Sequence, residues 1–151
     1  MVVRRAAAAV VVLVLAGCGG SSHSGATDKP PAVVPAASWT AISVAAAGGS
    51  SPAGPPAEVP VDARQNLVPL LASRLFDRPA PLAEYGLDHP QATLTYRSAT
   101  GETAIVDVGQ LNFDRHFVYA QRTGQPGVYL VPADTLRPVL ALVGIDLQPP
   151  E

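Results

Sequence analysis

Apolar and polar residues divide the chain into three parts: an apolar run near the start, a stretch rich in Gly, Ser, Pro and Ala, and a longer patterned region. The apolar run, residues 6–16, contains eleven consecutive Ala, Val and Leu residues directly after Arg4 and Arg5. As a helix it would span about 18 Å, whereas the hydrocarbon core of a bilayer is about 30 Å thick. The pattern therefore predicts a signal peptide over residues 1–17 rather than a membrane-spanning helix.

The sequence Leu15-Ala16-Gly17-Cys18 ends the apolar run and resembles a lipobox, in which small residues precede a cysteine that is acylated. Cys18 is the only cysteine, so no disulfide can form within the chain. Two or more acyl chains hold a protein stably at a membrane, because each buried CH₂ contributes about 0.8 kcal/mol. We therefore expect a lipoprotein anchored through Cys18, on the extracytoplasmic side of the cell membrane or outer membrane.

The stretch after Cys18 carries few large apolar side chains. Residues 18–37 cannot offset their own ordering entropy by burial, and we predict a flexible tether there. Residues 38–60 are expected to hold one short strand, Trp39–Ala46, followed by a Pro/Gly-rich loop. Residues 61–147 would then form the folded domain, and residues 148–151 a tail.

The first patterned segment, residues 62–77, predicts a helix with an apolar stripe at helical spacing. The stripe consists of Leu67, Leu70, Leu71 and Leu75. Two beginnings are compatible with the sequence. Asp62 and Gln65 form a capping-box pattern that leaves Pro69 inside the helix as a kink. If Asn66 is the N-cap instead, Pro69 falls in the first turn, where no N–H is needed.

From residue 92 onward the apolar period changes from helical spacing to two, which predicts strands. Residues 92–97 and 103–108 flank a Thr-Gly turn and form one predicted hairpin. Residues 116–121 and 128–131 flank the turn Thr-Gly-Gln-Pro-Gly and form a second.

A second helix is predicted over residues 135–143, with Asp134 as its N-cap and Gly144 as the residue that ends it. The expected fold is therefore α+β: a small antiparallel sheet of two hairpins packed against two helices. The pattern leaves open whether Trp39–Ala46 adds a further N-terminal strand to that sheet.

A series of short motifs in the patterned region resembles the bacterial family called domain of unknown function 4340. The series begins with the Tyr-Gly-Leu-x-x-Pro segment at residues 85–90, continues with a Val-Gly pair that ends the first hairpin, and ends with tyrosines in the second hairpin. The residues that match are Tyr85, Gly86, Leu87, Asp88, Pro90, Gly109, Tyr119 and Tyr129. The resemblance covers about residues 60–147.

The residue types in the first part of this motif have physical explanations. Gly86 can adopt a positive φ and end a helical turn after Tyr85. Asp88 can accept a hydrogen bond from the backbone ahead of it, and Pro90 keeps His89 extended at the start of the first strand. The chain also departs from the family pattern, because a Pro/Gly-rich loop stands where many members carry a Trp-containing segment. Members are often longer as well.

The resemblance implies fold and compartment and nothing about catalysis. Members resemble envelope-facing domains, and some accompany transporter or gliding-motility components of the ABC type. No catalytic residue follows from the resemblance. The fold it implies agrees with the two hairpins read from the period of the sequence.

The net charge and the composition limit the classes of partner that the protein is expected to bind. After the signal peptide is removed, eight basic and twelve acidic residues remain, giving a net charge of −4. No basic cluster is present to neutralise phosphates, so we predict no nucleic-acid partner. Attachment to the membrane is expected to come from the lipid rather than from charge.

The candidates for chemistry are few. Asp107 or Asp114 with His116 would make an acid–base pair, but these residues are better interpreted as solvated groups at strand ends and in a loop. No His/Cys/Asp/Glu spacing predicts a metal site, and no cofactor is expected. Four tyrosines could line a groove, although packing on half-buried strands is the more common role: Tyr85, Tyr96, Tyr119 and Tyr129.

The leading hypothesis is a non-enzymatic binding or adaptor module that engages an envelope protein, with an exposed sheet edge as the expected contact surface. The alternatives are a lipoprotein that binds a small molecule or glycan, and an enzyme acting on envelope polymers.

Overall fold

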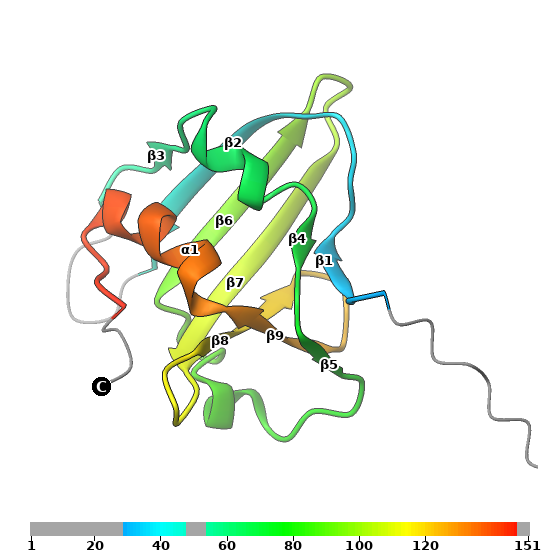
Figure 1. Cartoon of the computed structure of the whole chain (residues 1–151), viewed down its shortest axis with the longest axis vertical. Helices are drawn as coiled ribbons and strands as arrows, with labels where there is room; N and C mark the ends of the chain where they lie inside the picture. The colour runs from blue at the N-terminus through cyan, green and yellow to red at the C-terminus, as the bar shows by residue number, and fades with distance from the viewer. Residues whose placement is uncertain (1–28, 48–53, 148–151) are drawn as a thin grey trace, which may run out of the picture.

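The computed structural model describes residues 29–47 and 54–147 (Figure 1). The predicted signal peptide, the lipobox with Cys18, most of the predicted tether and the tail at 148–151 lie outside the described residues. The described strands are β1 (Ala32–Val34), β2 (Trp39–Ala46), β3 (Ala57–Glu58), β4 (Leu70–Leu71), β5 (Arg74–Phe76), β6 (Ala92–Ser98), β7 (Thr103–Leu111), β8 (Phe117–Arg122) and β9 (Val128–Pro132). The described helices are α1 (Ala133–Leu140) and the 3-10 helices η1 (Ala63–Asn66), η2 (Leu82–Tyr85) and η3 (Ala141–Val143).

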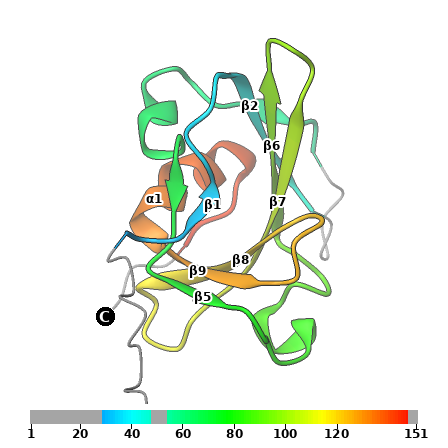
Figure 2. The ribbon, with the colours of Figure 1, turned by 90° about the vertical axis from the view of Figure 1, so that its right-hand side faces the viewer.

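Seven strands form one antiparallel sheet in the order β3-β2-β6-β7-β8-β9-β5, and β1 pairs with β4 in a separate two-stranded sheet. The large sheet is strongly bent. β2, β6 and β7 form a long wall, and β8, β9 and β5 turn across it to form a second, shorter wall (Figure 2). α1, η1 and the β1–β4 pair lie on the concave side between the two walls (Figures 1 and 2).

The long wall follows the alternation in its sequence. Ile42 and Val44 of β2 lie beside Tyr96 and Leu94 of β6, and all four side chains are buried on the concave side. The intervening residues face outward and are partly exposed. The strands predicted at 39–46, 92–97, 103–108, 116–121 and 128–131 are confirmed, and Trp39–Ala46 does join the sheet.

The predicted fold class, a small sheet of two hairpins packed against two helices, is wrong. The described residues form a mostly β structure with a seven-stranded sheet, a two-stranded sheet and a single short α-helix. The hairpins were predicted correctly, but they are the centre of a larger sheet. Strands β2, β3 and β5 extend it on both sides, through pairings between segments far apart in the sequence.

The helix predicted at residues 62–77 does not form. Its place is taken by the single turn η1, followed by β4 and β5. Neither capping alternative is realised, because Asp62 precedes η1 without a side-chain hydrogen bond and Asn66 is the last residue of η1. Pro69 cannot donate a helical hydrogen bond. The four leucines therefore do not share one buried face. Leu67 and Leu70 are fully buried, whereas Leu71 and Leu75 are partly exposed.

Short apolar segments inside the predicted tether and loop also belong to the fold. β1 lies within residues 18–37, and its Val33 and Val34 are fully buried. β3 lies within the predicted loop and pairs with β2, and Val59 directly after it is fully buried. Burying these valines removes apolar surface from water, which offsets the entropy of ordering a Pro-rich chain. The tether prediction therefore extended too far toward the domain.

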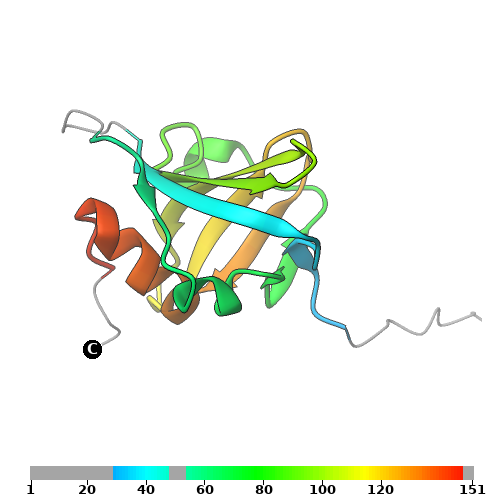
Figure 3. The ribbon, with the colours of Figure 1, turned by 90° about the horizontal axis from the view of Figure 1, so that it is seen from above.

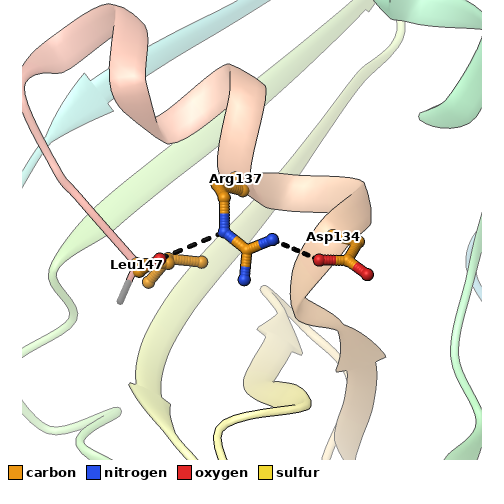
Figure 4. Close-up of polar contacts among 3 residues, drawn as sticks. All are labelled: Asp134, Arg137 and Leu147. Atoms are coloured by element: carbon orange, nitrogen blue, oxygen red, sulfur yellow. Dashed lines mark hydrogen bonds and ion pairs between the residues drawn. The ribbon is translucent and has the colours of Figure 1, made fainter. Parts of the chain in front are cut away.

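The C-terminal helix forms close to its predicted position. α1 begins at Ala133 with Pro132 as the N-cap, not Asp134, and η3 continues it to Gly144, which ends it as predicted, with a φ of 76°. The Nε of Arg137 donates to the carbonyl oxygen of Leu147 at 3.1 Å, and its guanidinium pairs with Asp134 (Figure 4). This contact holds the end of the described chain against α1, where Leu147 is buried. The chain enters the domain on the opposite side from this end (Figures 1 and 3).

The sheet bends between β7 and β8, and Gly109 lies at an irregularity in the pairing of these two strands. The register between β7 and β8 shifts between Val108 and Leu111, which is a bulge, and bulges bend the strand that carries them. A Cβ at position 109 would overlap the carbonyl oxygen of Tyr85 and would lie 3.1 Å from Cγ of Leu87. Only glycine fits here, because the η2 segment packs directly on the backbone of the bulge.

Tyr96 is the largest fully buried side chain of the core. Its ring packs edge-on against Trp39, with 5.7 Å between the ring centroids. Its hydroxyl has no hydrogen-bond partner within the described residues. Burial raises the pKa of the Tyr96 hydroxyl well above its ordinary value near 10, because the phenolate would be unsolvated.

Replacing Tyr96 with phenylalanine tests this environment. The folded pKa exceeds the unfolded one, so the unfolded state loses its proton first as the pH rises. The wild-type free energy of unfolding should therefore fall above pH about 10, by about 1.4 kcal/mol per pH unit from this group. Tyr96→Phe should not show this fall in the free energy of unfolding at alkaline pH. At pH 7 it should be as stable as the wild type or slightly more stable. Urea denaturation at pH 7 to 11 measures both, and identical alkaline slopes would contradict the assignment.

Replacing Gly109 with alanine tests the contact at the bend. The new Cβ would overlap the Tyr85 carbonyl, so we expect Gly109→Ala to lower the free energy of unfolding by about 2–4 kcal/mol. Gly54→Ala is the matched control, because nothing lies within 4 Å of a Cβ there and its φ is not positive. The control should stay within about 0.5 kcal/mol of wild type. Equal stability of the two variants would show that the close contact is absent.

Candidate functional site

The family-like motif at residues 82–90 covers the outer face of the short wall. The Tyr85 ring lies edge-on to Tyr119 of β8 at 4.8 Å and tilted to Phe76 of β5 at 6.2 Å, between ring centroids. The Tyr85 hydroxyl accepts a hydrogen bond of 3.1 Å from the Ala80 N–H. Gln110 Nε2 donates to the Glu84 carbonyl oxygen at 2.7 Å. These contacts hold η2 against β5, β7 and β8.

The local predictions for this motif match the geometry. Gly86 has a φ of 67° and ends η2, as expected for a residue that must be left-handed. An oxygen of Asp88 accepts a 2.9 Å hydrogen bond from the His89 N–H. Leu87 is buried against Gly109. The motif is thus a structural element that fixes the bend and the short wall.

A depression opens between β5 and the turn that joins β8 to β9, on the side of β5 that carries Leu75 rather than Phe76. We call it the β5 pocket. It has a volume of about 330 Å³ and is lined by Leu75, Asp77, Gln125, Pro126, Gly127 and Tyr129. Its lining is mostly apolar and includes the carboxylate of Asp77 and the side-chain amide of Gln125. This composition suits an apolar side chain accompanied by a donor or a cation.

Contacts among the lining residues fix the shape of the β5 pocket. Leu75 packs so tightly on Gly127 that a Cβ at that glycine would overlap the Leu75 side chain. The Tyr129 hydroxyl donates a 2.8 Å hydrogen bond to the side-chain oxygen of Gln125. Leu75 nevertheless stays 37% exposed, which leaves apolar surface facing the opening.

The pocket adjoins an unpaired strand edge. β5 is the last strand of the seven-stranded sheet and pairs only with β9, through Arg74–Leu130, Leu75–Tyr129 and Phe76–Val128. On its outer face the guanidinium of Arg74 lies 5.1 Å from the centre of the Phe76 ring, a cation–π contact. Unpaired edges accept an added strand from a second chain.

Two further depressions lie elsewhere on the surface. One of about 230 Å³ crosses the outer face of β3, β2 and β6, and polar residues alternate with small apolar ones in its lining: Ala41, Ser43, Pro56, Glu58, Thr95 and Arg97. The other, of about 300 Å³, lies where η1 and β4 meet the start of α1. Neither combines an apolar lining with a free sheet edge of three residues.

Each of the two candidate acid–base carboxylates accepts a hydrogen bond from a nearby residue. Asp107 accepts a 3.1 Å hydrogen bond from the hydroxyl of Thr93 on the neighbouring strand. Asp114 accepts one of 3.0 Å from the His116 N–H within their own loop. Among residues 29–47 and 54–147, no three potential metal ligands come together and no helix is long and apolar enough to cross a bilayer. The predicted lipidation site, Cys18, is outside these residues.

Sequence reasoning missed the β5 pocket for a definite reason. Leu75 was assigned to the inward stripe of a helix that does not form, and it is separated from Gly127 by about fifty positions in the chain. The one local signal was the Pro126-Gly127 pair at the end of the second hairpin turn. A turn glycine next to a strand marks a place where another group approaches the backbone closely.

The comparisons with known proteins agree with the resemblance in the sequence. No curated protein and no solved structure matches the chain. The model of the family described as domain of unknown function (DUF4340) matches residues 62–141, more than half of the chain. That match runs from η1 to the end of α1 and includes the β5 pocket and the Tyr85 motif. The chain belongs to the DUF4340 family.

Proposed function

We propose that the protein is a lipid-anchored, extracytoplasmic binding module that engages an envelope protein through the β5 pocket and the adjoining strand edge. The anchor rests on the sequence at residues 1–18, where two arginines, an apolar run and Leu15-Ala16-Gly17-Cys18 follow one another. Acylation of the Cys18 thiol would give the mature chain an anchor strong enough to need no other contact with the bilayer.

The distance between the anchor and the fold limits where a partner can be. β1 begins at Ala32, so thirteen residues separate it from Cys18. Fully extended, they reach at most about 45 Å. The folded domain is therefore confined to a layer next to the membrane. Partners within that layer are membrane proteins and other lipoproteins of the envelope.

The recognition surface is supported by the combination of the pocket and the edge. An added strand would gain main-chain hydrogen bonds from β5, while one of its side chains entered the β5 pocket. Asp77 at the rim would pair with a cation or a donor on that strand. Leu75 and Tyr129 form the apolar part of the lining. This arrangement fits an extended protein segment better than a compact small molecule, because the depression continues into an open edge.

A second candidate function is the binding of a glycan. It is favoured by the depression on the outer face of β2 and β6, where Glu58, Thr95 and Arg97 offer hydrogen-bonding groups. Cell-wall sugars present hydroxyl groups that such a surface could bind.

Photo-crosslinking in intact cells tests the first proposal. A photoreactive amino acid at Asp77, on the pocket rim, should yield a specific crosslinked protein, and Thr95 on the β2–β6 face is the matched control position. Leu75→Lys should lower the yield from Asp77 about tenfold, because it places a charge in the apolar pocket. Circular dichroism of the purified variant shows whether it is folded.

The outcomes separate the candidates. A protein captured at Asp77 and absent at Thr95 supports the module. Capture of the same protein with equal yield at both positions, or repeated absence of any protein at Asp77, contradicts it. Capture of glycan material at Thr95 alone would favour the second function.

A further inference from the structure

Phe113 stands out among the apolar side chains of the described residues, because it is 97% exposed. It lies in the loop between β7 and β8. An exposed phenyl ring costs free energy in water, and single aromatic side chains of this kind often become the anchor of an interface. The hydrogen bonds of the surrounding loop show whether Phe113 is held in this exposed position.

The loop is pinned by Asn112, the only buried polar residue of the described chain, at 8% exposure. The Asn112 N–H donates to the Phe117 carbonyl at 2.9 Å, and its side-chain oxygen accepts from the Phe117 N–H at 3.1 Å. The Asn112 carbonyl accepts from the Arg115 N–H at 3.1 Å. The Ala133 N–H, at the start of α1, donates to the His116 carbonyl at 2.9 Å. Phe113 is therefore presented by an ordered turn, so little entropy is lost when it binds.

The Phe113 loop and the β5 pocket lie at opposite ends of β8. β8 begins at Phe117, directly after the loop, and ends at Arg122, before the turn that supplies Gln125, Pro126 and Gly127 to the pocket. Figures 1 and 2 show the two connections at opposite ends of this strand. One copy of the domain cannot place its own Phe113 in its own β5 pocket, whereas a second copy can.

The two surfaces are complementary in size and charge. A protein cavity of about 150 Å³ already accepts a benzene molecule, and the β5 pocket has about 330 Å³ with Leu75 and Tyr129 in its lining. Asp114 and Arg115, of opposite charge, directly follow Phe113 in the loop. Beside the pocket stand Asp77 and Arg78, also of opposite charge and both exposed. Asp114 could therefore face Arg78, and Arg115 could face Asp77, across a contact between two copies.

We propose that Phe113 of one copy occupies the β5 pocket of a second copy, so that the anchored domains associate head to tail. This inference rests on the proposed function, since it names the occupant of the pocket assigned there. A contact between two different surfaces of the same chain either joins two copies reciprocally or continues from copy to copy, as a ring or an open chain. Anchoring on one membrane raises the effective concentration of the domains, which favours a contact built on a single ring.

Disulfide trapping on vesicles tests the contact directly. Mature lipidated chains carrying His116→Cys, beside Phe113, are mixed with chains carrying Asp77→Cys on phosphatidylcholine vesicles and mildly oxidised. Cys18 cannot take part, because its sulfur carries the lipid. The matched control replaces Asp77→Cys with Thr95→Cys on the open face of β6. The first mixture should give about tenfold more disulfide dimer than the control.

A third mixture adds Phe113→Ser to the His116→Cys chain, and the dimer yield should fall to that of the control. Since Phe113 is almost fully exposed, this change should not affect folding, which circular dichroism verifies. Equal yields in the three mixtures would reflect random collision and overturn the inference. If yields are equal while Leu75→Lys still lowers capture of a partner in cells, the contact between copies is refuted and the proposed function stands.

Discussion

The architecture depends on one close contact, in which the carbonyl of Tyr85 lies on the backbone of Gly109. The bulge at this glycine lets β7 belong to the long wall while β8 begins the short one. The two walls then enclose α1, η1 and the β1–β4 pair. A side chain at position 109 would push η2 away, and Tyr85 would lose its packing against Phe76 and Tyr119. The core, the bend and the family motif are therefore parts of one arrangement.

The bend also determines where the surface is open. β5 becomes the end of the sheet because the short wall turns away from the N-terminal strands, and no segment of the described chain pairs with its free side. The β8–β9 turn meets β5 there and forms the β5 pocket. The opposite end of β8 carries the Phe113 loop. The same strand thus separates a pocket from a protruding ring, which is what an end-to-end contact between copies requires.

Local sequence signals predicted the local parts of this structure. Alternation located β2, β6, β7, β8 and β9, since each buries every second residue on the concave side. Gly86, Asp88 and Gly144 were predicted correctly because their conformations depend on neighbours in the chain. The leucines at 67–75 were misassigned, because a stripe at helical spacing also fits a turn followed by two short strands. Only the pairing of β5 with β9 and of β1 with β4 decides between them, and such pairings join distant segments. The β5 pocket and the exposure of Phe113 arise from the same tertiary contacts.

Attachment of the chain to a membrane underlies the proposed function, since the confinement of partners and the concentration of copies both follow from it. Mass spectrometry of the protein purified from its native cells measures that attachment directly. We expect a mature chain that begins at Cys18 and carries the added mass of a diacylglyceryl group, with or without a further acyl chain. A chain with Met1 in place and an unmodified Cys18 thiol would contradict it.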